Sequence, residues 1–235
     1  MGSLNLNIKR ESLGRRSLTI AAVIVAATFL TSILSYSQLP ELIITHWNAQ
    51  GVGDGRGPRI TVFLIPIVSL VLIALFYFIP KIEPKKNIYK FKSQYTGFMN
   101  VTLLFMLFFN GITIAINMGI KLDLNRFLAL GIGNLFYFSG VYMKDAKQNW
   151  FFGIRTWWTL SNETVWDRTH EIGSKLFKAC GVIALAGALI PQYAIILILV
   201  PVLGVTIYLI YYSQKEYSKI IQDVTARAHT YKDAN

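Results

Sequence analysis

Six long stretches of almost uninterrupted apolar residues dominate this chain and restrict how it can fold. They run over 18–36, 60–79, 98–118, 127–143, 173–190 and 193–212. A helix that crosses a bilayer needs about 20 mostly apolar residues, within a working range of about 17–25. Only 15% of the 235 residues are charged, whereas an ordinary soluble domain has about 25%. The sequence therefore predicts an all-α, polytopic membrane protein, a six-helix transmembrane bundle.

The fifth stretch is the weakest of the six, because Lys175 and Lys178 lie in its first turns. A lysine stem can follow apolar surface while its amine reaches the interface, so we still expect a spanning helix here. The connections 119–126 and 191–192 are short, which makes the helices on either side of them antiparallel neighbours.

Positive charge gathers on one side of this layout. Of the 23 Lys and Arg residues, 19 fall in the two tails, in the second connection, and in the fourth connection with the entry into the fifth stretch. The other four are Arg56, Arg59, Lys121 and Arg126. Because Lys and Arg collect on the cytoplasmic side, both termini are predicted to be cytoplasmic. The net charge of +11 then reflects topology and contact with membrane lipids, and we expect no direct nucleic acid binding.

The same layout divides the chain into four parts. Residues 1–17 are expected to form a cytoplasmic basic tail, and 18–79 a first helical hairpin with an extracellular loop. Residues 80–212 are expected to form a four-helix core with a long cytoplasmic loop, and 213–235 a cytoplasmic tail.

Small and polar residues inside the spans point to helix packing. Asn110, Thr113 and Asn117 share one face of the third span, at spacings of three and four residues. They either line a cavity or form hydrogen bonds between helices, and we favour the hydrogen bonds because this is the common use of Asn and Thr in a bundle. Gly131 and Gly133 in the fourth span similarly predict close helix contact.

The chain lacks the motifs of an enzyme. No span carries Asp, Glu, Arg or His away from its ends, which argues against proton-coupled transport. His46, His170 and His229 are far apart in sequence, and no zinc motif, phosphate loop or nucleophile elbow is complete. We therefore predict no catalytic residue, no metal site and no cofactor. The single cysteine, Cys180, has no partner for an intrachain disulfide.

The first loop contains the segment His46-Trp47-Asn48, followed by a glycine-rich stretch that includes Asp54. Residues 43–47 are β-branched and aromatic, which favours a short extended segment. Trp47 is either an anchor at the membrane interface, where tryptophan normally collects, or part of a recognition surface. Composition alone leaves these two interpretations open.

The fourth connection concentrates aromatic residues in the segment N-W-F-F-G-I-R-T-W-W-T-L-S-N-E-T-V-W, residues 149–166. Half of positions 150–159 are aromatic, which is too many for exposure to water. These rings must lie in the interface or pack under the bundle, with Arg155 stacked on a ring or bound to lipid phosphate. Thr159 or Ser161 is expected to cap an amphipathic helix that leads into the fifth span. The segment is either a membrane anchor or a docking site for a partner.

These two loops together resemble a known family. The segment from Asn149 to Trp166 closely resembles the signature of SdpI-like membrane proteins, and the segment from His46 to Asp54 resembles the HWN-type module that precedes their core. The six-span layout is similar too, from about residue 18 to residue 212. Trp157 departs from the pattern, because the family usually has a proline between Thr and Trp, which would stiffen the turn.

The resemblance implies a multi-pass protein of the bacterial plasma membrane that protects its producer against a secreted peptide toxin. It also implies a receptor role, in which a cytoplasmic autorepressor is held at the membrane. We expect toxin recognition by residues of the first loop, namely His46, Trp47, Asn48 and Asp54. We expect a cytoplasmic output motif made of Asn149, Trp150, Gly153, Arg155, Thr156, Trp158, Thr159, Asn162 and Trp166. A transporter or permease for a small solute or peptide is the alternative that the sequence leaves open.

Overall fold

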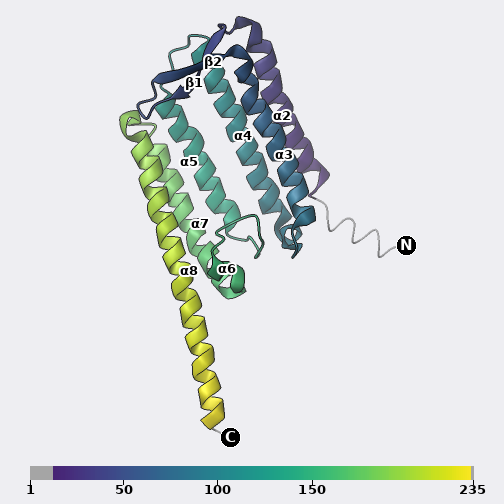
Figure 1. Ribbon diagram of the computed structural model, residues 1–235, viewed down its shortest axis with the longest axis vertical. Helices are drawn as coiled ribbons and strands as arrows, with labels where there is room; N and C mark the ends of the chain where they lie inside the picture. The colour runs from purple at the N-terminus through teal and green to yellow at the C-terminus, as the bar shows by residue number, and fades with distance from the viewer. Residues whose placement is uncertain (1–12, 234–235) are drawn as a thin grey trace, which may run out of the picture.

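The computed structural model describes residues 13–233, with side chains to residue 226. Its long helices run side by side, alternating in direction (Figure 1). They are α2 (Arg15–Ser35), α3 (Leu64–Ile82), α4 (Lys92–Asn117), α5 (Leu124–Met143), α7 (Glu163–Ala186) and α8 (Ala194–Asp233). The parts of the two predicted tails at residues 1–12 and 234–235 lie outside the described residues.

Four of the helices in the described chain are long and apolar enough to cross a membrane. With their flanking turns they cover Arg15–Gln38, Arg59–Ile82, Asn87–Asn117 and Pro191–Ala226. The chain is therefore a multi-pass membrane protein. Helices α5 and α7 pack in the same bundle but are less apolar, because α5 contains glycine, asparagine and tyrosine and α7 begins with charged residues. The predicted count of six crossings thus stays a prediction.

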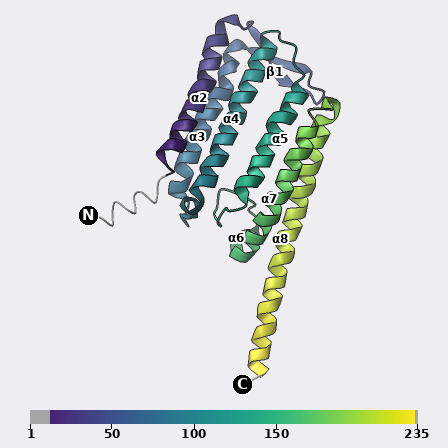
Figure 2. The same cartoon turned by 180° about the vertical axis from the view of Figure 1, so that it is seen from behind.

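The helices form two groups of three, α2 with α3 and α4, and α5 with α7 and α8 (Figures 1 and 2). Polar contacts hold the first group together. The Asn110 amide on α4 donates to the Thr28 carbonyl at 3.3 Å, the Thr31 hydroxyl at 3.1 Å and the Ser32 hydroxyl at 3.0 Å, all on α2. Hydrogen bonding between helices, the favoured interpretation, is therefore confirmed for Asn110. It is not confirmed for the other two residues of that face, because Thr113 lines a cavity and Asn117 bonds to Ile44 of the first loop.

Close backbone packing holds the second group together. A Cβ atom on Gly133 of α5 would lie 3.0 Å from the Gly181 carbonyl of α7, and one on Gly140 would lie 2.6 Å from the Ser174 carbonyl. Gly131 abuts the Phe105 ring of α4, which brings the two groups together. The predicted close contact at Gly131 and Gly133 is confirmed.

A two-stranded antiparallel hairpin interrupts the helical pattern, so the all-α prediction was wrong at this point. Strands β1 (Leu42–Trp47) and β2 (Gly53–Pro58) follow the short turn η1 (Tyr36–Gln38). The extended segment at 43–47 was expected, but its glycine-rich partner has low strand propensity. Glycine is needed there because a Cβ atom on Gly53 would lie 2.6 Å from the Ile44 side chain, which crosses over β2.

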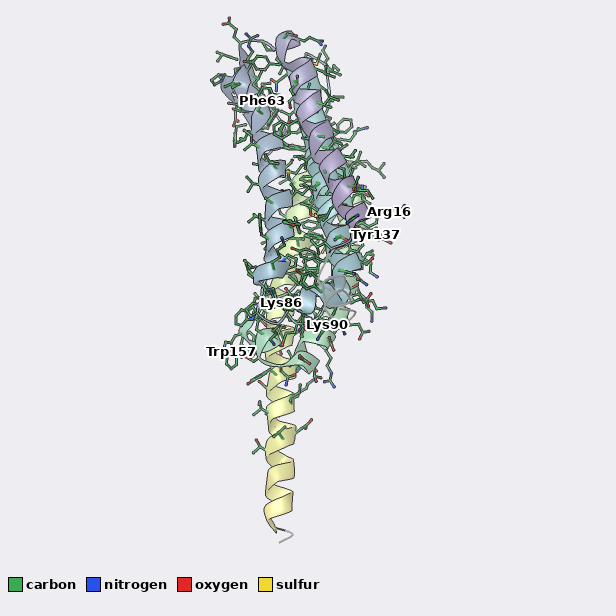
Figure 3. The ribbon with its side chains drawn as sticks, turned by 90° about the vertical axis from the view of Figure 1, so that its right-hand side faces the viewer. Arg16, Phe63, Lys86, Lys90, Tyr137 and Trp157 are labelled. Atoms are coloured by element: carbon green, nitrogen blue, oxygen red, sulfur yellow. The ribbon has the colours of Figure 1, made fainter. Side chains whose placement is uncertain are left out.

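The hairpin lies at one end of the bundle, and the long loop 144–156, the short helix α6 (Trp157–Ser161), the beginning of α2 and the end of α8 lie at the other (Figure 1). The turn η3 (Asn87–Phe91) belongs to this second end as well. Lys86, Lys90 and Trp157 are found there, far from Phe63 at the hairpin end (Figure 3). The loops that the charge count groups on one side are thus together in space.

Candidate functional site

The hairpin is fixed to both helix groups by two asparagine side chains. Asn117, the last residue of α4, accepts a hydrogen bond from the Ile44 amide at 2.6 Å and donates to the Ile44 carbonyl at 3.1 Å. It therefore pairs with the edge of β1 as a neighbouring strand would. Asn125 in the first turn of α5 donates to the Ala49 carbonyl at 3.1 Å, which ties the hairpin turn to the other group.

The four residues predicted for toxin recognition lie together on this hairpin, but they make different contacts. His46 Nδ1 lies 2.5 Å from Asp54 Oδ1, and both side chains are exposed. An exposed pair of this kind contributes at most about 1 kcal/mol to stability. Asn48 shapes the turn, because its side-chain oxygen accepts hydrogen bonds from the Gln50 and Val52 amides, each at 3.0 Å. Trp47 is half-buried.

A cavity of about 660 Å³ lies beneath the hairpin. Strand β1, the turn η2 (Arg59–Phe63), α3, α4, α5 and the beginning of α8 all contribute to its wall. His46, Trp47 and Asn48 line it from the hairpin, and Phe109 and Leu128 line it from α4 and α5. Lining a cavity was the alternative interpretation of the polar face of α4, and it holds for Thr113. The position of the cavity could not be predicted, because it forms only where the hairpin covers the space between the two helix groups.

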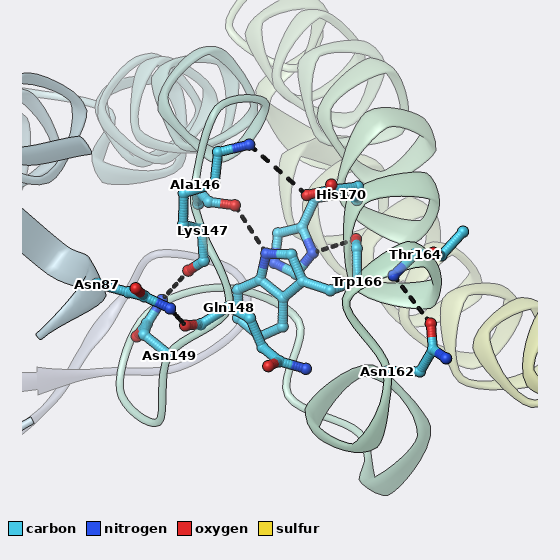
Figure 4. Close-up of polar contacts among 10 residues, drawn as sticks. Asn87, Ala146, Lys147, Gln148, Asn149, Asn162, Thr164, Trp166 and His170 are labelled. Atoms are coloured by element: carbon cyan, nitrogen blue, oxygen red, sulfur yellow. Dashed lines mark hydrogen bonds and ion pairs between the residues drawn. The ribbon is translucent and has the colours of Figure 1, made fainter. Parts of the chain in front are cut away.

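At the opposite end, Asn149 organises the aromatic loop from a fully buried position. Its amide nitrogen donates to the Lys147 carbonyl at 2.8 Å and to the Phe152 carbonyl at 3.0 Å. Its oxygen accepts from the amides of Phe151 at 2.9 Å and Phe152 at 2.7 Å. The neighbouring Gln148 carbonyl accepts from the Asn87 side chain at 2.7 Å, so the loop is also tied to the turn before α4 (Figure 4).

Trp166 and His170, one turn apart on α7, form the centre of this loop (Figure 4). The Trp166 indole donates to the Ala146 carbonyl at 2.7 Å, and its ring stacks on that of His170 with centroids 4.0 Å apart. The Ile154 amide donates to His170 Nε2 at 3.0 Å, which leaves Nδ1 to donate to the Trp166 carbonyl at 2.8 Å. Burial lowers the pKa of His170 to about 4, so the ring is neutral at neutral pH.

Gly153 owes its place in the motif to this histidine. Its φ of +108° is a conformation that side chains with a Cβ rarely adopt. A Cβ atom there would also overlap Nε2 of His170, where the Ile154 amide binds. His170 was not among the predicted site residues, because from the sequence it belonged only to an incomplete zinc motif. The spacing of four residues from Trp166 was the signal that two buried rings share one helix face.

Two successive caps begin the helices after the loop. Thr156 caps α6, accepting from the Thr159 amide at 3.2 Å, while the Thr159 hydroxyl accepts from the Thr156 amide at 3.0 Å. Trp157 is then the first residue of α6. Proline is favoured at the first position of a helix, which explains why the family usually has proline where this chain has Trp157. Asn162 caps α7, and the expectation of Thr159 or Ser161 was wrong because both residues belong to the separate helix α6.

The predicted output motif is thus divided between buried and exposed residues. Asn149, Thr159 and Trp166 are fully buried, whereas Trp150 is 50% exposed. Arg155 is exposed, and its guanidinium donates to the Trp150 carbonyl at 2.7 Å. Trp158 is half-buried. Trp157, which was not among the predicted site residues, is 67% exposed and contacts the Tyr217 ring edge-on. Among residues 13–226, no group of three His, Cys, Asp or Glu side chains is placed to hold a metal ion.

Both ends of the bundle coincide with regions that match known families. The SdpI/YfhL protein family matches residues 145–213, and a domain of unknown function, DUF1648, matches residues 23–70. The chain is 32% identical over 185 residues to "Immunity protein SdpI" of Bacillus subtilis (strain 168), which covers 78% of this chain and 87% of that protein. It is 29% identical over 93 residues to an uncharacterized protein of Archaeoglobus fulgidus, covering 40% of this chain and 48% of the other. No solved structure matches.

Proposed function

This chain belongs to the SdpI family, and from that premise we propose that it is a membrane immunity protein that protects the producing bacterium against a secreted peptide toxin. One observation carries the proposal: the 32% identity to Immunity protein SdpI, which extends over 78% of this chain. The proposed role is non-enzymatic. Its chemistry would consist of binding a peptide and of responding to it.

The proposed topology has six crossings, with both termini in the cytoplasm. Helices α5 and α7 would cross together with the four more apolar helices, because they pack within the same bundle. The hairpin would then lie outside, and the loop with α6 inside. The sequence count supports this orientation, because 19 of the 23 Lys and Arg residues belong to segments on the side predicted to be cytoplasmic.

Toxin recognition is proposed for the hairpin, through His46, Trp47, Asn48 and Asp54. His46 and Asp54 present exposed polar groups, and Trp47 offers a half-buried aromatic face beside the cavity. Asn48 would act indirectly, because its oxygen is used by the turn. Aromatic residues that are partly buried at a binding surface often dominate its affinity.

The output is proposed for residues 149–166, which would hold a cytoplasmic autorepressor at the membrane. Arg155, Trp150 and Trp157 are among the exposed groups of this segment and would supply the contacts with the repressor or with membrane lipids. The buried members, Asn149 and Trp166 among them, would hold the loop in shape.

Replacing Trp47 with Ala tests the proposed immunity. The variant should be produced in cells that lack Immunity protein SdpI and challenged with the peptide toxin against which that protein gives immunity. Truncation at the strongest position of a binding surface costs about 2 kcal/mol or more. The toxin concentration at which protection fails should therefore be about 30-fold lower for the variant. The matched control is Val52→Ala, at an exposed position in the same hairpin. Full protection by Trp47→Ala, at an equal amount of protein in the membrane, would contradict the proposal.

A further inference from the structure

The outer face of α5 carries an amide side chain halfway along the helix. Asn134 lies between the ends of the helix at Leu124 and Met143, so about 14 Å of helix or more extends on either side of it. Its side chain is exposed, and its nitrogen donates to the Leu130 carbonyl of its own helix at 2.8 Å. An asparagine side chain has two N–H donors and an accepting oxygen. The oxygen and one N–H of Asn134 are therefore left for a partner.

In the proposed topology this amide lies at the centre of the membrane. The hydrocarbon core of a bilayer is about 30 Å thick, so the middle of a crossing helix is far from water on both sides. An amide that faces hydrocarbon loses its hydrogen bonds to water without gaining others, which is costly. Tyr137, one turn further along α5, also lies between the two ends of the bundle (Figure 3). A polar position there indicates a surface that another protein covers.

A groove and a ridge lie side by side on this face. The groove has a volume of about 260 Å³ and runs between α4 and α5, with Leu104 and Phe108 on one wall and Asn134 on the other. The ridge consists of three exposed side chains of α5 at helical spacing, Leu130, Tyr137 and Val141. Because a twofold interface uses the same patch on both partners, a groove beside a ridge lets two copies interlock.

We propose that this face binds a second copy of the chain, with the Asn134 side chains of the two copies hydrogen-bonded to each other. Copies of one protein are inserted in the same orientation, so a twofold axis along the membrane normal places each residue opposite its equivalent at the same depth. An asparagine amide is complementary to itself, because it both donates and accepts. An acyl chain would fill the groove but could not pair with the amide. The proposal rests on the proposed crossing of α5 and does not depend on a toxin.

Energy transfer between copies in liposomes measures this association. The full-length protein carries Cys180→Ser and one thiol at Val52→Cys, an exposed position on the hairpin, which is labelled with a donor or an acceptor dye. The two samples are reconstituted together in phosphatidylglycerol liposomes at increasing ratios of lipid to protein. We expect energy transfer above the level of random proximity, decreasing on dilution with lipid as a dimer dissociates.

Two substitutions of the same amide test its role. Asn134→Leu removes the hydrogen bonds between the copies and should weaken the dimer at least about threefold. Asn134→Gln keeps an amide and should associate more tightly than Asn134→Leu. The matched control is Thr206→Val, at an exposed position of α8. It should leave the association unchanged, because the Thr206 hydroxyl donates to the Val202 carbonyl of its own helix at 2.8 Å.

A second pair of variants tests the groove. Leu104→Trp places a large side chain in the groove wall and should weaken the dimer at least about tenfold, because the ridge of the other copy no longer fits. Leu203→Trp, at a similarly exposed position of α8, should not. Size-exclusion profiles and melting temperatures establish that each variant is folded.

The outcomes separate the possible partners of this face. Energy transfer at the random level at every lipid ratio would overturn the proposal, as expected if the face binds lipid or a different membrane protein. Association that Asn134→Leu leaves unchanged would place the contact on another surface and overturn it too. A thiol reagent that reaches both Lys121→Cys and Lys144→Cys from one side would remove the crossing of α5, and the proposal with it. Protection of cells without association would overturn the dimer alone, whereas association without protection would contradict the proposed immunity alone.

Discussion

Replacing Gly153 with Ala should destabilise the aromatic loop by an amount that the structure allows us to divide into two parts. The first part is the backbone, since Gly153 has a φ of +108°. Holding a residue with a Cβ atom in such a conformation costs about 1–2 kcal/mol. The second part is steric, because the new methyl group would overlap His170 Nε2 and separate it from the Ile154 amide.

Losing that hydrogen bond leaves a buried N–H group without a partner, which costs about 1–3 kcal/mol. The two parts together predict a loss of about 2–5 kcal/mol in the free energy of unfolding. This is a large fraction of the total, because a typical protein has a free energy of unfolding of about 5–15 kcal/mol. Equilibrium unfolding in mixed micelles, followed by tryptophan fluorescence, measures this loss. Trp166 is a suitable reporter because its ring stacks on His170.

Gly111→Ala is the matched control, because a Cβ atom at Gly111 on α4 meets nothing within 4 Å and its φ is negative. It should be neutral, or stabilising by up to about 1 kcal/mol through helix propensity. In a His170→Ala background, the cost of Gly153→Ala should fall to its backbone part, about 1–2 kcal/mol. A cost that is below about 0.5 kcal/mol, or that stays the same without His170, would refute this explanation of the motif glycine.

Three further predictions concern titration, topology and output. Because burial lowers the pKa of His170 from 6.5 to about 4, the folded protein binds fewer protons than the unfolded chain as the pH falls below 6.5. The free energy of unfolding should therefore decrease by about 3 kcal/mol between pH 6.5 and 4, and His170→Ala should remove this slope. In a Cys180→Ser background, a thiol reagent should reach Val52→Cys in intact cells and Ser161→Cys only after permeabilisation; the reverse pattern would invert the proposed topology. Arg155→Ala should reduce recruitment of a co-expressed, fluorescent repressor to the membrane with toxin protection unchanged, and unchanged recruitment would make Arg155 a lipid anchor.

Hydropathy predicted the helices well because each of them needs a long apolar face, and spacing along one helix placed Asn110 toward a neighbour. The hairpin was only half predicted. Its first strand has β-branched residues, but the second consists largely of glycine and is positioned by side chains distant in sequence. Asn117 at the end of α4 pairs with Ile44, a contact over 73 residues that no local pattern indicates.

The resemblance to a family identified the residues of the aromatic loop, but it could not assign their roles. Trp166 and Asn149 resemble recognition residues in sequence, whereas both are fully buried in the fold. His170 lies outside the signature, yet its ring accepts a hydrogen bond from the Ile154 amide. Its importance depends on a close approach to Gly153, which exists only once the loop has folded back on α7.

The two ends of the bundle share one mechanical property, because each is joined to both helix groups. The hairpin is bonded to α4 through Asn117 and to α5 through Asn125. At the opposite end, the Phe152 ring packs against the Phe98 ring of α4, with centroids 5.1 Å apart. The Ile154 amide there donates a hydrogen bond to His170 of α7.

A shift of one helix group relative to the other would therefore strain both ends. A peptide that binds the hairpin shifts them only to the extent that it binds one arrangement more tightly than the other. The aromatic loop at the opposite end would respond to the same shift through the contacts of Phe152 and Ile154. No separate chain of side-chain contacts across the membrane would be needed. Coupling between recognition and output thus requires two packings of these helix groups, with the hairpin and the loop both sensitive to which one is populated.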